Sequence, residues 1–312
     1  MARKLRVQSA GAIYHVLNRG DRREPIFRED RDRELFLETL GQACGKTDWQ
    51  VHAWCWMNHH FHLVMETPRA NRVPGMKWFL SAYTARFNRR HKGCGHLFGG
   101  RYKALLVEGG GGGYLKTVCD YVHLNPVRAQ QLASGDKLSA YRWSSYGEYL
   151  KPAGQRRPWL RVDRLLGAWH IPKDSAAGRE PFAQPMEIRR ATEENASELR
   201  RIRRGWCFGS PEFRQELFEP RDRRFGRHPG GPERQESEAA QAERVLGGEM
   251  RRRHWRAEDL IRRRKGDRET AKLAWRLRQE TTVTWDWIAG KLAMGSAGYA
   301  ANCVREIREQ SR

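Results

Sequence analysis

Short runs of β-favouring residues alternate with runs of helical periodicity between residues 12 and 125 of this 312-residue chain, and this order limits the folds that it can adopt. The predicted strands are residues 12–18, 51–56, 60–66 and 102–108. The predicted helices are residues 31–44, 74–90 and 114–125. Asn58 and His59 separate the second strand from the third, which predicts a hairpin. The order therefore predicts an α+β fold, with a ferredoxin-like antiparallel sheet and helices on one face.

The rest of the chain divides by composition into two further parts. The first domain, residues 1–150, is expected to close near Leu150, and prolines then interrupt the periodicity. Residues 151–245 are therefore expected to be a linker with short helices, partly disordered, and Arg221–Glu238 a loosely held loop rich in Arg, Gly, Pro and Glu.

Residues 246–312 are expected to form a helical DNA-binding region. The region contains three amphipathic segments, residues 268–279, 285–292 and 296–307, and the turn Ala293-Met294-Gly295 joins the second to the third. Two short helices joined by a turn with glycine, beside a supporting helix, are typical of a helix-turn-helix. A three-helix cap without DNA contact is the alternative.

The charge of the chain favours a polyanionic partner. Its 59 Lys and Arg residues exceed its 37 Asp and Glu residues, for a formal net charge of +22. Such a field attracts nucleic acid, although a GC-rich genome would also increase the arginine content. No stretch is apolar enough for a membrane span, and a bacterial protein of the cytoplasm, associated with the nucleoid, is expected.

Two other classes of site have little support in the sequence. The six cysteines contain no CxxC pair, so they indicate neither a zinc ribbon nor a disulfide framework. The run Gly109–Gly113 is not followed by Gly-Lys-Ser/Thr, so it is expected to be a flexible connector and not a phosphate-binding P-loop.

The segment His60-Phe61-His62 is the sharpest chemical feature of the sequence. Residues two apart on a strand point to the same face, so the imidazoles of His60 and His62 would lie side by side while Phe61 enters the opposite layer. Two such nitrogens can bind one divalent ion. Either histidine alone would more often be an ordinary core or surface residue.

A second segment adds a phenol and an amide. Tyr121 and Asn125 are four residues apart, which on a helix places them one above the other. The amide oxygen could be a third, hard ligand, with the phenol beside the metal. Tyr102 is the nearest rival nucleophile, and His59 and His123 are second choices as ligands because His59 has the wrong strand parity and His123 projects away from the Tyr121 face.

These segments resemble a known family. His60-Phe61-His62, the strand Gly100–Ala104 and the helix Tyr121–Arg128 are similar to motifs of the HUH single-tyrosine transposases, most closely the REP-associated tyrosine transposases, over roughly Gly11–Leu150. Many relatives carry Pro-Asn before the first histidine, whereas Asn58-His59 precedes it here. The resemblance implies the HUH fold, Mg²⁺ or Mn²⁺ bound by His60 and His62 with Asn125 in the position of the third ligand, and Tyr121 as nucleophile.

The implied activity is that of a single-strand endonuclease and strand transferase. A phenolate attacking a metal-bound phosphodiester would leave a 5′-phosphotyrosine and a free 3′-hydroxyl, which preserves the bond energy for rejoining without ATP. The expected partner is single-stranded or hairpin DNA, and the expected state is a monomer or homodimer. A domesticated DNA-binding regulator that no longer transposes, and a phosphoesterase using activated water, are the alternatives.

Basic and aromatic side chains around these motifs are candidate DNA contacts. Aromatic residues can stack unpaired bases, although Trp54, Trp56, Trp78 and Phe98 are at positions more typical of a core. The basic candidates for phosphate contact are Arg86, Arg89, Arg90, Lys92, Arg101, Lys103 and Arg128.

Overall fold

The computed structural model of the protein describes residues 8–133, 135–192, 201–202, 205–217 and 238–310. The loop expected at Arg221–Glu238 lies, up to residue 237, outside the described residues. The first part of the chain contains strands β1 (Ala12–Arg19), β2 (Gln50–Met57), β3 (His60–Thr67) and β4 (Lys103–Val107), and helices α1 (Asp30–Thr47), α2 (Arg72–Arg90), α3 (Tyr114–His123) and α4 (Asn125–Arg128). The predicted order of strands and helices is confirmed.

The strands form one sheet in the order β2-β3-β1-β4-β5. The pairs among the first four strands are antiparallel. β5 (Cys207–Phe208), which the sequence did not indicate, adds to the edge parallel to β4. The α+β class and the ferredoxin-like sheet are thus confirmed.

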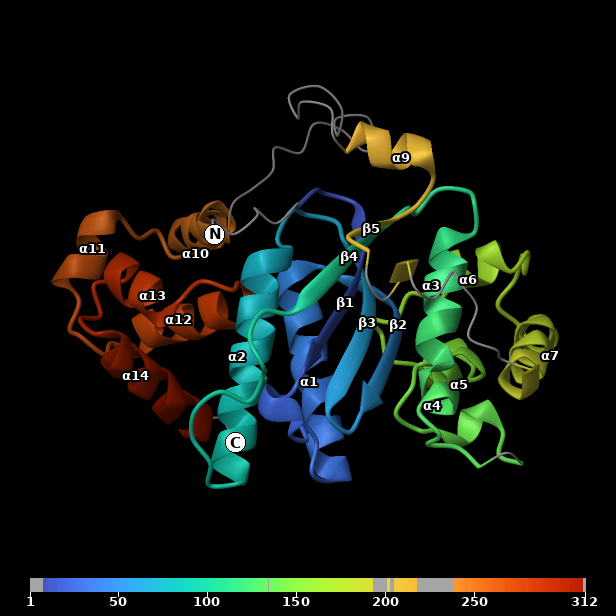
Figure 1. Ribbon diagram of the computed structural model, residues 1–312. Coiled ribbons are helices and arrows are strands. Elements are labelled where there is room, and N and C mark those ends of the chain that lie inside the picture. The colour runs from blue at the N-terminus through green and yellow to red at the C-terminus, as the bar shows by residue number, and fades with distance from the viewer. Residues whose placement is uncertain (1–7, 134, 193–200, 203–204, 218–237, 311–312) are drawn as a thin grey trace.

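Helices cover both faces of this sheet (Figure 1). Phe61 of β3 contacts Phe36 of α1 and Phe79 of α2, with ring centroids 5.1 and 6.4 Å apart. His62, the next residue along the strand, instead lies against Tyr121 of α3. The expectation that helices lie on one face therefore holds for α1 and α2, whereas α3 packs on the opposite face. A second layer is needed because side chains of β3 are buried on both faces.

The chain after residue 130 adds mainly helices. They are α5 (Tyr146–Tyr149), α6 (Asp163–Ala168), α7 (Ala176–Thr192), α9 (Pro211–Glu216), α10 (Glu238–Arg252), α11 (Ala257–Arg262), α12 (Arg268–Glu280), α13 (Trp285–Lys291) and α14 (Ala297–Gln310). The mainly helical C-terminal region is confirmed, and α12, α13 and α14 lie where three helices were expected. A DNA-binding role for them remains a prediction.

The buried apolar side chains form two clusters. The first surrounds the sheet and also includes Leu165, Phe182 and Phe208, so chain beyond residue 150 packs onto the sheet. The second lies among α10 to α14. The boundaries expected near residues 150 and 245 remain predictions. In the described part of the chain, no helix is both long and apolar enough to cross a membrane.

An ion pair joins the sheet to α6. Glu66 of β3, with a side chain 13% exposed, accepts a hydrogen bond from Arg164 Nη1 at 2.7 Å and lies 3.2 Å from His52 Nε2. Burial alone would raise the pKa of this carboxyl, but the hydrogen bonds from His52 and Arg164 outweigh burial and lower the pKa to about 2. Arg164 also donates to the carbonyl of Gly109 at 2.8 Å.

Glu66 is therefore expected to make the stability of the protein depend on pH. Between the ordinary pKa of 4.5 and about 2, the unfolded chain binds the proton and the folded chain does not, so the free energy of unfolding falls as the pH falls through this window. This contribution approaches about 1.4 kcal/mol per pH unit. Urea unfolding between pH 5 and pH 3 should show a shallower loss for Glu66→Gln than for the native chain. Equal slopes for the two proteins would contradict the assignment.

Candidate active site

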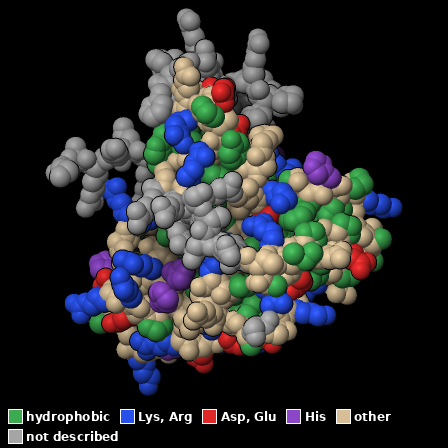
Figure 2. All heavy atoms as spheres, turned by 45° about the vertical axis from the view of Figure 1, so that its right-hand side comes forward, with side chains coloured by type: hydrophobic (Ala, Val, Ile, Leu, Met, Phe, Trp, Pro, Cys, Tyr) green, Lys and Arg blue, Asp and Glu red, His purple; other side chains and the backbone are tan. Residues whose placement is uncertain are grey.

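A cavity of about 310 Å³ opens on the face of the sheet that α3 covers. It is lined by Leu17, Met57, His60, His62, Tyr121, Asn125, Arg128 and Ala129. The structure thus brings together the four residues singled out as nucleophile and metal ligands. In Figure 2, histidine side chains reach the surface beside Lys and Arg side chains.

His60 and His62 face the cavity because they are two residues apart on β3. Their ring centroids are 5.1 Å apart and their planes nearly perpendicular, at 82°. Burial, together with the nearby charges of His59 and Arg19, lowers the pKa of His60 to about 4. His60 is therefore neutral at pH 7, with a nitrogen lone pair available to a cation.

His15 of β1 completes this group, and sequence reasoning missed it. Its Nε2 lies 2.9 Å from His62 Nδ1, the two rings are stacked, and His15 is 1% exposed. Burial lowers the pKa of His15 to about 4, so one imidazole donates and the other accepts. If His62 donates from Nδ1, its Nε2 is the ring nitrogen with a lone pair for a ligand.

Tyr121 lies against both of these imidazoles. Its ring centroid is 5.8 Å from that of His15 and 5.8 Å from that of His62, in edge-on contacts. Arg128 covers the ring, with its guanidinium carbon 4.6 Å from the centroid, and donates from Nη1 to the Tyr121 carbonyl at 2.7 Å. These contacts hold the phenol at the wall of the cavity.

Asn125 approaches Tyr121 in a different way from the one expected. The expected single helix ends at His123, and Asn125 starts α4, because Pro126 lacks the N–H that would bond to the carbonyl of Val122. Asn125 Nδ2 takes over part of this role, donating to the Tyr121 carbonyl at 3.1 Å and to that of Val122 at 3.5 Å. The amide oxygen is then the atom of Asn125 that suits a cation.

Two basic side chains besides Arg128 lie on the cavity side of the sheet. Lys103 of β4 is exposed and lies opposite Leu17 of β1. Leu17 in turn lies opposite His62 of β3, so the three side chains share one face of the sheet. Arg19, which sequence reasoning did not single out, is exposed and pairs with His60. Arg101 is exposed two residues before Lys103.

The structure does not bring Arg86, Arg89 and Arg90 to the cavity. All three lie on α2, which covers the opposite face of the sheet. Arg90 is paired with Glu29 at 2.5 Å and with Asp32 at 3.4 Å. Helical spacing shows which residues share a side of a helix, but not which face of the sheet the helix covers.

The second-choice residues fall into two groups. His59 is exposed in the turn before β3. His123 is buried, donating or accepting a 2.8 Å hydrogen bond with Ser145 Oγ, so it is not solvated as one interpretation allowed. Trp54 and Trp56 stack on each other in the core, with centroids 5.0 Å apart, which excludes them as platforms for bases.

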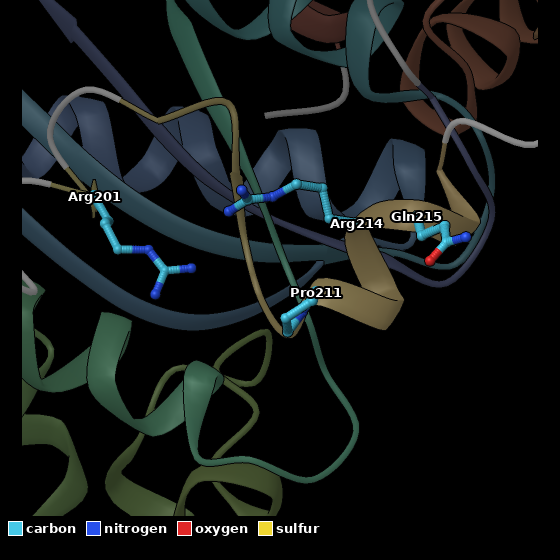
Figure 3. Close-up of a pocket in the computed structure, with 4 residues that line it drawn as sticks. All are labelled: Arg201, Pro211, Arg214 and Gln215. Carbon is cyan, nitrogen blue, oxygen red and sulfur yellow. The ribbon is translucent and has the colours of Figure 1, made fainter.

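Two other places attract notice but lack the cavity's combination of groups. Glu29, Asp32 and His91 place possible ligand atoms within 4.8 Å of one another, yet the Arg90 guanidinium already pairs with both carboxylates. A separate cavity of about 300 Å³ is lined by Arg201, Pro211, Arg214 and Gln215, and Figure 3 shows that its two arginines come from different elements.

Comparison with known proteins finds a transposase family whose model matches part of the chain. Residues 8–125 match the model of the family described as "Transposase IS200 like", which confirms the resemblance to transposases seen in the sequence. The match covers His60, His62, Tyr121 and Asn125. No curated protein matches the chain.

One solved structure similar to this chain is titled "Structure of the REP associates tyrosine transposase bound to a REP hairpin". The TM-score is 0.40 at 14% sequence identity, and the match covers 53% of this chain and 93% of that one.

Proposed function

We propose that this protein cuts and rejoins single-stranded DNA, at hairpin or repeat sequences, through a covalent bond between Tyr121 and a phosphate. One observation carries the proposal: two imidazoles, an amide oxygen, a phenol and a guanidinium line the same cavity. All five groups come from one chain, which supports an active site complete in a single protomer.

The donor set fits a divalent cation. His60 and His62 would hold it through ring nitrogens, with Asn125 supplying an amide oxygen. The bound ion would neutralise and orient the scissile phosphate. Because imidazole is a poorer ligand for Mg²⁺ than for Mn²⁺, we propose Mn²⁺ as the better of the two ions.

The side chains around the ion would perform the transfer. The Tyr121 phenol loses its proton, its oxygen forms a bond to phosphorus, and the bond from phosphorus to the 3′ oxygen breaks. The released 3′ oxygen takes up a proton as a hydroxyl. Arg128, above the Tyr121 ring, and Lys103, on the same face, would neutralise the phosphate charge.

The direct test is to incubate the purified protein with Mn²⁺ and a labelled hairpin DNA, then separate products under denaturing conditions. A labelled band at the mass of the protein supports the phosphotyrosine link. Turnover without any protein-linked DNA would favour a phosphoesterase that uses water. A footprint without cleavage would favour a DNA-binding regulator. Either result would overturn the proposal.

His15 is expected to act as a positioning residue for His62. The contact of 2.9 Å fixes which His62 nitrogen carries the proton, and loss of such a partner commonly weakens metal binding by about 10- to 100-fold. His15→Leu should weaken Mn²⁺ binding to this extent in calorimetry. His15→Asn, whose amide oxygen can accept the hydrogen bond, should recover part of it. Equal affinities for the two variants would show that His15 only fills space.

A further inference from the structure

A groove of about 870 Å³ lies on the opposite side of the sheet from the cavity, between α1 and α2 on one wall and α12, α13 and α14 on the other. Figure 1 shows these C-terminal helices beside α2, away from α3. Arg86 and Arg89, expected at the catalytic site, lie in this groove instead.

A buried lysine holds the two walls together. Lys46 of α1 is 4% exposed, and its Nζ donates to the carbonyls of Gln279 at 2.8 Å and Thr281 at 3.2 Å, and also to that of Arg278. These carbonyls end α12, where the helix dipole favours a positive charge. The groove is therefore a built feature of the fold and not a loose gap between two parts.

The groove concentrates positive charge, and none of the residues that line it is acidic. Arg86 and Arg89 come from α2, and Arg278 and Arg308 from α12 and α14. Arg86 donates to Thr39 and Gln42, and Arg278 to the carbonyl of Val283. Across the described ranges, no carboxylate lies within ion-pair distance of any of the four arginines.

The pKa of Arg86 shows the effect of placing these positive charges close together. Burial lowers its pKa, Glu38 opposes this, and the charge of Arg308 on the other wall lowers the pKa further. Like charges held close together repel, and an anion between them removes the repulsion. The groove is therefore complementary to a polyanion.

Three indole rings lie among these charges. Trp78 of α2 and Trp275 and Trp285 of α12 and α13 line the groove, and each is partly exposed. Positive grooves with aromatic rings bind single-stranded nucleic acid, since unpaired bases stack on the rings while the cations contact phosphates. A duplex keeps its bases stacked internally and cannot use such rings.

We infer that this groove is a second DNA site, which binds an unpaired stretch of strand through Arg89, Arg308 and the indole of Trp285. The inference rests on the proposed function only in taking DNA as the polyanion. Because the sheet separates the groove from the cavity, a strand in the groove leaves the cavity free for the phosphate to be cut.

The test uses the full chain carrying Tyr121→Phe, in EDTA, so that binding is measured without cleavage. Fluorescein-labelled oligo(dT), which forms no hairpin, is titrated at several salt concentrations and followed by fluorescence anisotropy. Arg89→Ala combined with Arg308→Ala should weaken binding at least about tenfold and reduce the slope of log affinity against log salt by about 1.4, or 0.7 per lost phosphate contact. Arg305→Ala, on α14 but outside the groove, is the matched control and should change the affinity little.

Two further variants separate stacking from charge and from folding. Trp285→Leu should weaken binding about tenfold with the salt slope unchanged. Ala85→Glu places a carboxylate at an exposed position of the groove without loss of packing, and should weaken binding to a similar degree. Thermal melting followed by circular dichroism reports whether each variant is folded.

Three outcomes would overturn the inference. They are an Arg89 and Arg308 double variant that loses no more affinity than Arg305→Ala, tighter binding of duplex than of oligo(dT), and equal competition by polyglutamate. Failure of the native protein to form DNA adducts, with groove binding intact, would instead count against the proposed function alone.

Discussion

Tyr121→Phe is expected to abolish the covalent protein–DNA adduct while leaving DNA binding largely intact. The substitution removes one oxygen atom, which is the proposed nucleophile, and keeps the ring that packs on His15 and His62 and under Arg128. Loss of the nucleophile in a covalent mechanism typically costs at least about a thousandfold in rate. The measurement is the yield of labelled adduct with hairpin DNA and Mn²⁺.

Tyr102→Phe is the matched control for this result. Tyr102 is the nearest rival tyrosine, and its hydroxyl lies 3.3 Å from Arg72 Nη1, away from the cavity lining. This variant should form adducts at close to the native level. Adducts that persist in Tyr121→Phe and vanish in Tyr102→Phe would identify Tyr102 as the nucleophile.

His60→Ala and His62→Ala are each expected to remove metal binding and adduct formation together. Each imidazole supplies one of three proposed ligands, and a cation that keeps one nitrogen and one amide oxygen should bind at least about a hundredfold more weakly. Calorimetry with Mn²⁺ measures the first loss, and the adduct assay measures the second.

His59→Ala is the comparison for the histidine variants. His59 precedes His60 and contacts its ring at 4.7 Å between centroids, but it does not line the cavity. It should bind Mn²⁺ and form adducts like the native protein. Cleavage by the native protein that continues unchanged in EDTA would contradict the role of the metal.

The sequence predicted the parts of the site that depend on local periodicity. Alternation along β3 places His60 and His62 on one face and Phe61 on the other, as observed. The four-residue spacing brought Asn125 to Tyr121 despite the break at Pro126, and the Asn125 amide donates to the Tyr121 carbonyl at 3.1 Å. Such features need only neighbours in the chain.

The features that depend on distant pairing could not be predicted. His15 meets His62 through the register of β1 against β3, across 47 residues of chain, and nothing near His15 marks this partner. The face that α2 covers, which carries Arg86 and Arg89 away from the cavity, is likewise decided by tertiary packing. β5 is too short to show a pattern of its own.

The sheet also acts as a partition between the two sides of the molecule. His62 projects from one surface of β3 and Phe61 from the other, so anything bound beyond α2 is hidden from anything bound beside α3. A short oligonucleotide would reach only one of the two proposed DNA sites at a time. A longer one must bend around a sheet edge, and its two attachments then reinforce each other by raising the local concentration of the second segment. The length of the DNA would therefore decide whether one molecule can bind the groove and the cavity at the same time.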